Sequence, residues 1–395
     1  MQRSSKTRNP FITTVADGPD FCDRTRELAE LERLTQGGQS VVLSSPRRYG
    51  KTSLVCHALE FLHEQDFLTV YADFFSVLSE QDFVTKLAKA VIAGIGRGAA
   101  SSGNFQKRLA NLFKSFTVMF TVHQNEMSIS ATMTPGTSPA AGLDDVMESL
   151  FSYVQKNNRK ACCVFDEFQE ISTLPESKRI EGTLREHIQM QKNVSFVYVG
   201  SRRQLLVDMF GKNRPFYGSS VSMTLDKVSS ADFVPYIVRK FSETGKTCSS
   251  ALASVIYDRT AGYPIYVQRL ASLAWSMTDT ICGEETVERA WNLLLDESKD
   301  SFEATWTQLP PVRRRLLTSI ALEPTAQPHA HEYLQRYQLS ASGVENAMEA
   351  LKVLELIEYG KEWHLVDPVM AAWIRDVRAY TIQTVAQEPE AKDSP

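Results

Sequence analysis

The stretch that decides the fold is Ser45-Pro46-Arg47-Arg48-Tyr49-Gly50-Lys51-Thr52-Ser53-Leu54. It follows a short apolar run at 40–44 that is typical of a buried strand. It leads into residues 52–63, whose apolar side chains recur at helical spacing. A strand, a turn and a helix are therefore predicted in this order, with the turn at the start of the helix.

Residues 45–52 match the phosphate-binding pattern G-x-x-x-x-G-K-[ST] except at the first position, where Ser45 replaces glycine. Such a loop surrounds phosphates with backbone N–H groups at a helix N-terminus. Its lysine, here Lys51, would neutralise the β and γ oxygens, and Thr52 would offer its hydroxyl to Mg²⁺. The predicted contacts to ATP or ADP are Ser45, Pro46, Arg47, Arg48, Tyr49, Gly50, Lys51, Thr52 and Ser53.

A second motif lies about 110 residues downstream, and it matters because a Gly-Lys-Thr tripeptide alone is common by chance. The hydrophobic strand at 161–165 ends in Asp166-Glu167, the form of a Walker B strand. Asp166 would hold Mg²⁺ through water, and Glu167 would polarise the attacking water. The alternative is a strand that merely ends in two solvated acids. The two motifs together favour a nucleotide site.

The remaining candidates for catalysis follow the strand at 194–199. This strand ends in Gly200-Ser201, where Ser201 would sense the γ-phosphate or simply cap the strand. Phosphoryl transfer is mostly positioning and charge stabilisation, so an arginine is expected to assist. Arg202, Arg203 and Arg214 are available for this role, and Arg203 and Arg214 are the candidates.

Strand and helix patterns alternate around these motifs, which is the signature of a parallel sheet. Strands are predicted at 40–44, 67–74, 161–165 and 194–199, so the sheet has at least four. Helices are predicted at 25–34, 52–63, 80–95, 143–156 and 178–191. Residues 94–142 break the rhythm and predict an insertion made of a helix near 107–116 and a β-hairpin.

The fold class predicted for the chain is α/β, a parallel-sheet P-loop NTPase core followed by a helical lid and a winged-helix domain. Helical patterns take over after residue 229, and three helices with a short hairpin follow Pro310-Pro311. The predicted parts are an N-terminal arm at 1–20, packed on a domain that starts near Phe21, the core at 21–228, the lid at 229–302, the winged helix at 303–380 and a disordered tail at 381–395.

Over about residues 9–376 the sequence resembles the archaeal-type P-loop ATPases of the AAA+/STAND class. Besides the two motifs, the landmarks are Asn9-Pro10-Phe11, the box at 21–28, Gly200-Ser201, Gly262-Tyr263-Pro264 and Asp367-Pro368. In such proteins the box lies near the adenine and the Gly-x-Pro segment of the lid approaches the phosphates. The resemblance therefore implies Arg24 and Pro264 as nucleotide-side residues.

Three positions depart from the pattern of this family. Asp23 stands where the box usually has glycine, and Ser45 replaces the first glycine of the loop. Ser219 stands where relatives often carry arginine, which argues against a trans-acting finger from that segment.

The amino-acid composition limits the cellular compartments and the classes of partner expected for the protein. The 395 residues are 43% hydrophobic and carry a net charge of −4, and no run of about 18 apolar residues occurs. This excludes a membrane span and a global basic field for nucleic acid. Six cysteines without a Cys-x-x-Cys pair indicate buried thiols of a reducing compartment, and Cys162 and Cys163 should face opposite sides of their strand. A cytoplasmic location is expected.

A winged helix usually suggests DNA. Here residues 303–378 carry ten Asp and Glu against eight Lys and Arg. The expected recognition helix at 342–356 has three glutamates and one lysine, so it would repel phosphate. Arg313-Arg314-Arg315 is the only basic cluster there. Docking of an unidentified protein partner or autoinhibition is favoured over DNA binding.

Three functions remain open. The leading hypothesis is an ATPase that hydrolyses ATP with Mg²⁺ and acts as a nucleotide-dependent switch or small motor. The second is a nucleotide-locked module that binds ADP or ATP with negligible turnover and recruits a protein. The third is a DNA-handling ATPase with a basic patch assembled across domains. Oligomerisation is compatible with all three.

Overall fold

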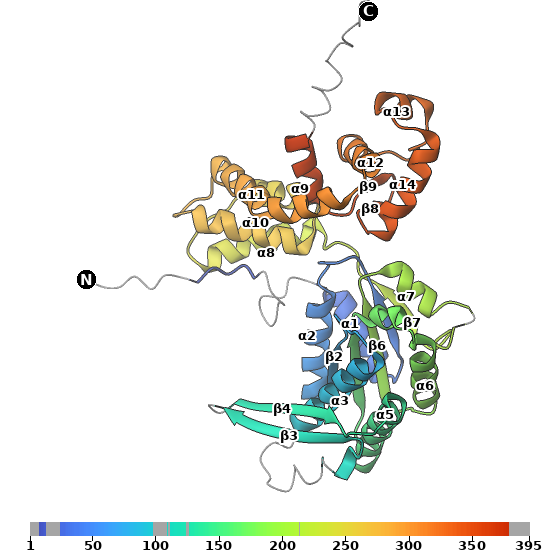
Figure 1. The fold of residues 1–395 in the computed structure, drawn as a ribbon. Helices are drawn as coiled ribbons and strands as arrows, with labels where there is room; N and C mark the ends of the chain where they lie inside the picture. The colour runs from blue at the N-terminus through green and yellow to red at the C-terminus, as the bar shows by residue number, and fades with distance from the viewer. Residues whose placement is uncertain are drawn as a thin grey trace, which may run out of the picture. The chain divides into compact units, whose positions relative to one another are not determined.

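The computed structural model describes residues 8–12, 24–97, 109, 111–123, 126–212 and 214–378 (Figure 1). It divides the chain into two compact units. One is Val15–Asp226, and the other combines Met1–Thr14 with Lys227–Pro395. Asp23, most of the arm at 1–20 and the tail at 381–395 lie outside the described residues.

The unit Val15–Asp226 is built on a parallel sheet of five strands in the order β2-β5-β6-β1-β7. The strands are β1 (Val41–Ser44), β2 (Leu68–Asp73), β5 (Ala161–Asp166), β6 (Val194–Gly200) and β7 (Val221–Thr224). Four of them are the predicted strands. The fifth, β7, is a short edge strand with one buried residue, Met223, so its sequence has no apolar run to reveal it.

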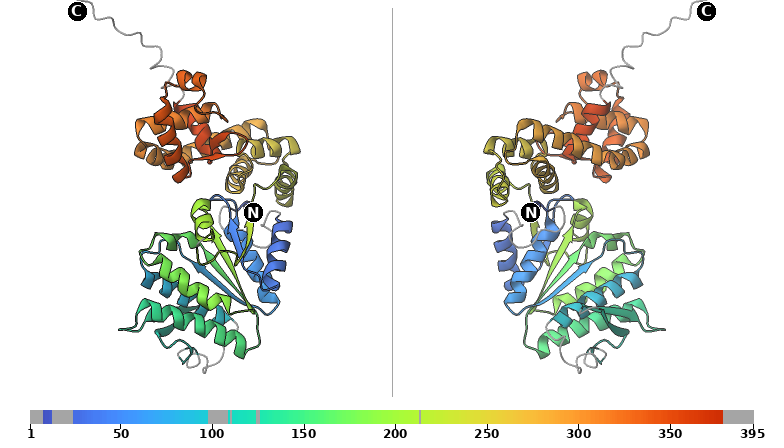
Figure 2. Two further views of the ribbon diagram at one scale, coloured as in Figure 1. Left: turned by 90° about the vertical axis from the view of Figure 1, so that its right-hand side faces the viewer. Right: turned by 90° about the vertical axis from the view of Figure 1, so that its left-hand side faces the viewer.

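Helices cover both faces of this sheet. The helices α1 (Thr25–Gln36) and α2 (Lys51–Glu64) cover one face. The other face carries α3 (Glu80–Arg97), α5 (Pro139–Lys156), α6 (Ser177–Gln189) and α7 (Arg203–Met209) (Figure 2). Cys162 packs in the core on the α1 and α2 side, and Cys163 packs in the core on the α3 and α5 side. The predicted alternation of these two side chains is therefore confirmed.

The insertion contains an antiparallel hairpin of β3 (Phe116–His123) and β4 (Glu126–Met133). Its base packs on the core, because Phe116 and Met133 are buried in the same cluster as α3 and α5. Residues 107 and 108 of the predicted helix lie outside the described residues, while 109, 111 and 112 are helical. Helix α3 continues to Arg97, and helix α5 already starts at Pro139. The insertion between them is therefore shorter than the predicted span 94–142.

The other unit is mainly helical. Its helices are α8 (Ser230–Glu243), α9 (Ser250–Arg259), α10 (Pro264–Met277), α11 (Glu284–Gln308), α12 (Pro311–Leu322), α13 (His331–Arg336), α14 (Ala341–Val353) and α15 (Pro368–Trp373), and a π-helical turn, Ile374–Arg378, follows. The hairpin β8 (Ile357–Tyr359) and β9 (Trp363–Leu365) forms the wing. Helix α11 runs through the predicted boundary at 302 and 303, because Trp306 continues its buried stripe and contacts Trp373.

The described part of the N-terminal arm packs on helices of this second unit. Asn9 Nδ2 donates to Ser272 Oγ on α10 at 2.9 Å, and the Phe11 ring contacts the ring of Phe241 on α8. Phe11 is buried. The expectation that the arm packs on the domain that starts near Phe21 is therefore wrong for these residues, because a buried aromatic ring anchors them between α8 and α10.

None of the helices that the structure describes is long and apolar enough to cross a lipid bilayer.

Candidate active site

The loop at 45–53, which carries the predicted phosphate-binding pattern, connects β1 to α2. Gly50 has φ 85° and is the N-cap of α2, a left-handed conformation that glycine adopts without strain. Ser45, by contrast, is not among the described residues with positive φ, and its side chain is fully buried. The substitution of serine for the first glycine is therefore compatible with the backbone of this loop.

Lys51 is held inside the loop. Its Nζ donates to the carbonyl oxygens of Ser45 and Pro46 at 2.8 and 2.9 Å, and the residue is only 6% exposed. Lys51 is also the first residue of α2, whose first turn carries no acidic residue. A cation at this end opposes the helix dipole, so the site as a whole favours an anion.

Asp166 ends β5 and is almost completely buried. Its Oδ2 accepts hydrogen bonds from Thr52 Oγ1 at 3.0 Å and from the hydroxyl of Tyr71 at 2.7 Å. Burial raises the pKa of the Asp166 carboxyl, and the hydrogen bonds from Tyr71 and Thr52 oppose that shift. Asp166 Oδ1 also accepts from the backbone N–H of Glu167 at 2.9 Å, so all three of these donors to the buried carboxylate are neutral groups, which offset its desolvation less than a cation would.

These residues fit the protein's share of a Mg²⁺-nucleotide site. The described residues contain no cluster of three or more His, Cys, Asp or Glu side chains that could form a complete metal cage. Mg²⁺ in nucleotide sites needs no such cage, because phosphates and water supply most of its ligands. The adjacent Thr52 hydroxyl and Asp166 carboxylate meet the remaining requirement.

Glu167 is held in an unusual backbone conformation beside Asp166. Its φ of 50° and ψ of 37° are left-handed, which is rare for glutamate and recurs at functional sites. Its Oε2 accepts hydrogen bonds from Ser201 Oγ at 3.0 Å and from Gln169 Nε2. The carboxylate of Glu167 therefore points toward the end of β6, where Ser201 lies.

Two further contacts extend this network. Arg47 Nε of the loop lies 3.5 Å from Ser201 Oγ, so the hydroxyl links the loop to Glu167. Gln169, in the 3-10 helix η2 (Phe168–Thr173), is fully buried against Gly200. A Cβ at Gly200 would come within 2.2 Å of Gln169 Oε1. Glycine at this position is therefore required for Gln169 to reach Glu167.

The two predicted arginines have different surroundings. Arg203 is exposed at the first residue of α7. Arg214 forms an ion pair with Glu181, a fully buried carboxylate on α6. Arg203 is thus accessible to a ligand or a partner, whereas the guanidinium of Arg214 is engaged within its own unit.

Arg24 contacts the backbone of the loop at 45–53. The residue is 5% exposed and has φ 93° at the N-cap of α1. Its Nη2 donates to the carbonyl of Tyr49 at 3.1 Å and to the carbonyl of Asp226 at 2.6 Å. Arg24 therefore ties the backbone of the loop to the residue where its unit ends.

Pro264, the other residue implied by the family resemblance, belongs to the second unit. It is the first residue of α10 and lies two residues after Gly262, which has φ 70°. A Cβ at Gly262 would come within 2.6 Å of the Tyr257 hydroxyl. Glycine is required in this turn for both reasons.

Sequence reasoning missed Tyr71 and Gln169. Tyr71 belongs to β2, whose residue Asp73 is in register with Asp166, so alternation along β2 places Tyr71 and Asp73 on one face. Finding this contact needs the strand order. Gln169 lies only two residues after Glu167, and a polar residue that close to a candidate base was the available signal.

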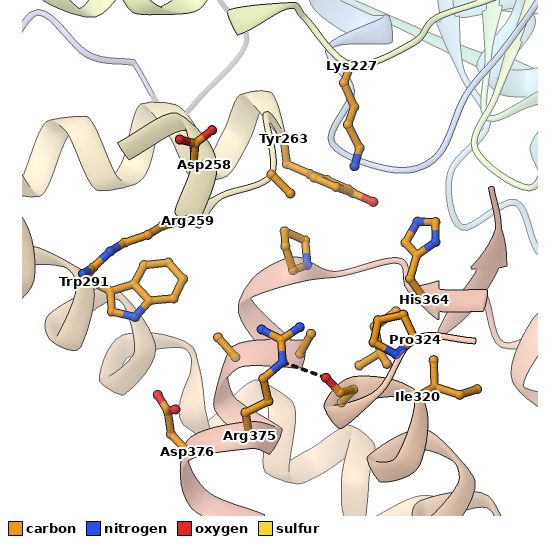
Figure 3. A pocket seen from close by; sticks show the side chains of 16 residues that line it. Lys227, Asp258, Arg259, Tyr263, Trp291, Ile320, Pro324, His364, Arg375 and Asp376 are labelled. Carbon is orange, nitrogen blue, oxygen red and sulfur yellow. Dashed lines mark hydrogen bonds between the residues drawn. The ribbon is translucent and has the colours of Figure 1, made fainter. Parts of the chain in front are cut away.

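The second unit has a cavity of about 420 Å³ with lining from both the lid and the winged helix (Figure 3). Its cations have partners within the unit. The ammonium of Lys227 lies 4.5 Å from the centre of the Tyr263 ring, Arg259 pairs with Glu288, and Arg375 Nε donates to the Ala321 carbonyl at 2.7 Å. We therefore assign no ligand to this cavity.

The basic cluster of the winged helix is also engaged. Arg314 donates to the carbonyls of Trp306 and Thr307 at the end of α11, and Arg315 donates to the carbonyl of Gln338. The contacts to Trp306 and Thr307 fall on the last turn of α11, where carbonyl groups lack the partners they have within a helix. Two of the three arginines thus have a structural role.

Comparison with known proteins agrees with this architecture. A family model described as an ATPase domain predominantly from Archaea matches residues 21–270, and one described as a probable winged helix domain matches residues 300–376. A search of curated proteins found no match.

Solved structures share the fold at low identity. The Walker-type ATPase of Pyrococcus abyssi is 18% identical with a TM-score of 0.63, over 90% of this chain and 96% of that one. The ORC2 protein of Aeropyrum pernix in its ADPNP–ADP complexes is 14% identical with a TM-score of 0.56, over 93% and 98%.

The match to the ATPase model covers more than half of the sequence and includes the loop, Asp166-Glu167 and Gly200-Ser201. The chain therefore belongs to the family of ATPase domains found predominantly in Archaea, and its ATPase core is followed by a winged helix domain.

Proposed function

We propose that this protein binds ATP in the loop at 45–53 and hydrolyses it with Mg²⁺, so that the bound nucleotide controls the lid and winged-helix unit. The observation that carries the proposal is the network at the carboxyl edge of the sheet. It brings Lys51, the Thr52–Asp166 pair and Glu167 to the same edge of one unit. The adenine nucleotides in the Aeropyrum pernix ORC2 structure support the choice of ligand.

Each residue has a distinct part in this proposal. Lys51 would exchange its loop carbonyls for the β and γ phosphate oxygens, a charge-assisted contact. Mg²⁺, held by Thr52 and Asp166, would neutralise charge on the phosphates. Glu167 would orient the attacking water and accept its proton. The loop, including Ser53 at the start of α2, would surround the phosphates with N–H groups.

Ser201 and Arg203 have supporting parts. Ser201 donates to Glu167 and contacts Arg47, so it would relay the state of the loop to the catalytic carboxylate. Arg203 is the better candidate for charge stabilisation, because Arg214 is paired with Glu181. Arg24 would stabilise the loop, and Pro264 would act from the lid, as the family resemblance implies.

The nucleotide-locked module is a second candidate, favoured by one observation. Glu167 is held by both Ser201 and Gln169, so it must be released or realigned before it can activate water. Slow turnover is the expected consequence. Membership of the STAND class, a cytoplasmic location, a protein partner and oligomerisation stay predictions.

The test is steady-state phosphate release with Mg²⁺, together with calorimetric binding of ATP to the full chain. Glu167→Gln should lower turnover at least about 100-fold and leave the ATP dissociation constant within a few-fold, since the amide cannot accept a proton. The matched control is Glu170→Gln, in the 3-10 helix that Glu167 caps and also in contact with Gln169. It should keep its turnover.

Two results would change the conclusion. Unchanged turnover in Glu167→Gln would remove Glu167 from the role of base. Negligible turnover of the wild-type chain with copurified ADP would establish the locked module instead. Absence of any adenine nucleotide binding by the wild-type chain would overturn both candidates.

A further inference from the structure

Two cysteines lie together in the lid helices, outside the proposed nucleotide site. Cys248 precedes Ser249, the N-cap of α9, and Cys282 precedes Gly283, the N-cap of α11. They are 3% and 4% exposed, and neither takes part in the proposed hydrolysis. They belong to two segments that the chain separates by α9 and α10.

The backbone aligns these two segments in register. Thr247 and Ile281 form a parallel bridge, in which Thr247 N donates to the Thr280 carbonyl and Cys282 N donates to the Thr247 carbonyl, both at 2.8 Å. The next pair in this register is Cys248 and Cys282. Side chains at paired positions of parallel strands project to the same face, with α-carbons about 5 Å apart. Disulfides span that separation without backbone movement.

The chemistry of the two thiols is complementary. In the fully protonated pair each thiol donates to the carbonyl of the next residue, Cys248 Sγ to Ser249 at 3.6 Å and Cys282 Sγ to Gly283 at 3.9 Å. A hydrogen bond from the Cys248 thiol to the thiolate form of Cys282 lowers the pKa of Cys282 to about 7, although burial opposes the shift. The same bond raises the pKa of Cys248. Cys282 therefore has a larger thiolate fraction near neutral pH than an ordinary cysteine, and the thiolate is the form that attacks disulfides.

The other described cysteines lack this arrangement. Cys162 and Cys163 are neighbours in β5, but their side chains lie on opposite faces of the sheet, and burial raises the pKa of both. Cys56 lies on α2, where burial also raises the pKa of its thiol. The pairing thus singles out Cys248 and Cys282 among the cysteines that the structure describes.

We propose that Cys248 and Cys282 form a reversible disulfide, by exchange with a small-molecule disulfide, that links the starts of α9 and α11. The Cys282 thiolate attacks one sulfur of the external disulfide, forms a mixed disulfide and releases one thiolate. Cys248 then loses its proton and attacks Cys282 Sγ, which forms the internal disulfide and releases the second thiol. The two cysteines lose two electrons, and the external disulfide is reduced to two thiols.

The disulfide would cross-link the two ends of the segment 248–282, which contains α9, α10 and the turn at Gly262. A cross-link of this length removes conformational freedom from the unfolded chain and so stabilises the folded unit. The expected gain for this unit is a rise in its unfolding temperature of about 5 °C or more. The inference does not depend on ATP binding or hydrolysis.

The experiment uses the full chain, unfolded in urea and refolded in a buffer of reduced and oxidised glutathione, so that burial does not limit access. Free thiols are then alkylated, and the disulfides are mapped by mass spectrometry of peptides. The expected product is lighter by two hydrogen atoms, links Cys248 to Cys282, unfolds at higher temperature and reverts with dithiothreitol. Cys248→Ser and Cys282→Ser should lose the link, whereas Cys56→Ser should retain it.

The mapping of the wild-type chain decides the proposal even if a serine variant fails to fold. A refolded chain in which Cys248 and Cys282 remain alkylated thiols, or pair with other cysteines, overturns it. An internal disulfide that forms without any rise in the unfolding temperature overturns the proposed stabilisation of the segment 248–282.

Discussion

Two lysines in different units make the same kind of contact and differ in what surrounds it. Lys51 donates to the carbonyls of Ser45 and Pro46, and Lys246 donates to the carbonyls of Trp275 and Thr278. Lys246 lies between α8 and α9, and its ammonium reaches the C-terminal end of α10, where a cation complements the helix dipole. The same ammonium lies 3.8 Å from the centre of the Trp275 ring.

Lys51 lies at the opposite kind of helix end. It is the first residue of α2, where the dipole favours negative charge, and no carboxylate of the first turn balances it. The dipole of α10 therefore stabilises the ammonium of Lys246, whereas the dipole of α2 opposes the ammonium of Lys51 and favours an anion at the same helix end. A buried, hydrogen-bonded lysine at a helix N-terminus thus indicates an anion site more strongly than one whose ammonium lies at a helix C-terminus.

The largest expected effect tests this comparison directly. Lys51→Met should weaken ATP binding about 100-fold or more, because a charge-assisted contact to phosphate contributes roughly 3 kcal/mol. Lys246→Met should leave the affinity unchanged and lower the free energy of unfolding by about 1–2 kcal/mol. Isothermal titration with ATP and thermal unfolding of both variants measure the two quantities. Equal ATP affinity of the two variants would break the comparison.

A smaller effect is expected from one tyrosine in each unit whose hydroxyl donates a hydrogen bond to an oxygen atom. Tyr71 donates to Asp166, and Tyr333 donates to the carbonyl of Glu323. In Tyr71→Phe the carboxylate loses a donor that favours its charged form, so the pKa of Asp166 should rise further. The Mg²⁺ concentration for half-maximal turnover should then rise about 3- to 10-fold, since a hydrogen bond to a charged group is lost.

Tyr333→Phe is the matched control. It should lower the unfolding temperature but leave the Mg²⁺ requirement at the wild-type value. If Tyr71→Phe behaves in the same way, Tyr71 has only a structural part.

The smallest effect concerns the wing. His364 Nε2 lies 3.2 Å from Glu358 Oε1, and this hydrogen bond raises the pKa of His364 above its ordinary value. A raised pKa in the folded state means that the contact stabilises fully below about pH 6.5, the unfolded value, and is lost as the pH rises through the folded value. The Tyr263 hydroxyl and Lys227 also face this pair.

His364→Gln should therefore lower the unfolding temperature by about 1–2 °C at pH 6 and by less at pH 8.5, because a half-exposed pair contributes little. Thermal unfolding at both pH values measures the difference, and ATP affinity should stay constant throughout. A larger loss at pH 8.5 would contradict the assignment of the shift to Glu358.

Much of the nucleotide site could be predicted from the sequence because its central parts are local. The loop at 45–53 and the pair Asp166-Glu167 each occupy consecutive residues between a strand and a helix. The alternation of strands and helices predicts a parallel sheet, and the carboxyl ends of parallel strands meet at one edge, which is why these two segments converge.

Contacts between neighbouring strands could not be predicted in this way. Tyr71 reaches Asp166 only because β2 lies beside β5 in the sheet. The edge strand β7 has one buried residue and no apolar run. The arm was misplaced for a related reason, since the burial of Phe11 against α8 depends on which helices form the lid surface.

The sequence by itself determined the α/β class, the strand–loop–helix unit around the candidate phosphate-binding loop, the acidic pair at the end of β5 and the helical and winged-helix character of the second half. These follow from motifs and periodicities that span a few turns of chain. The tertiary structure alone decided that Arg24 binds the loop, that Arg214 is paired with Glu181, and that Cys248 meets Cys282. Such contacts join residues far apart in the chain, because strand order and helix packing bring them together.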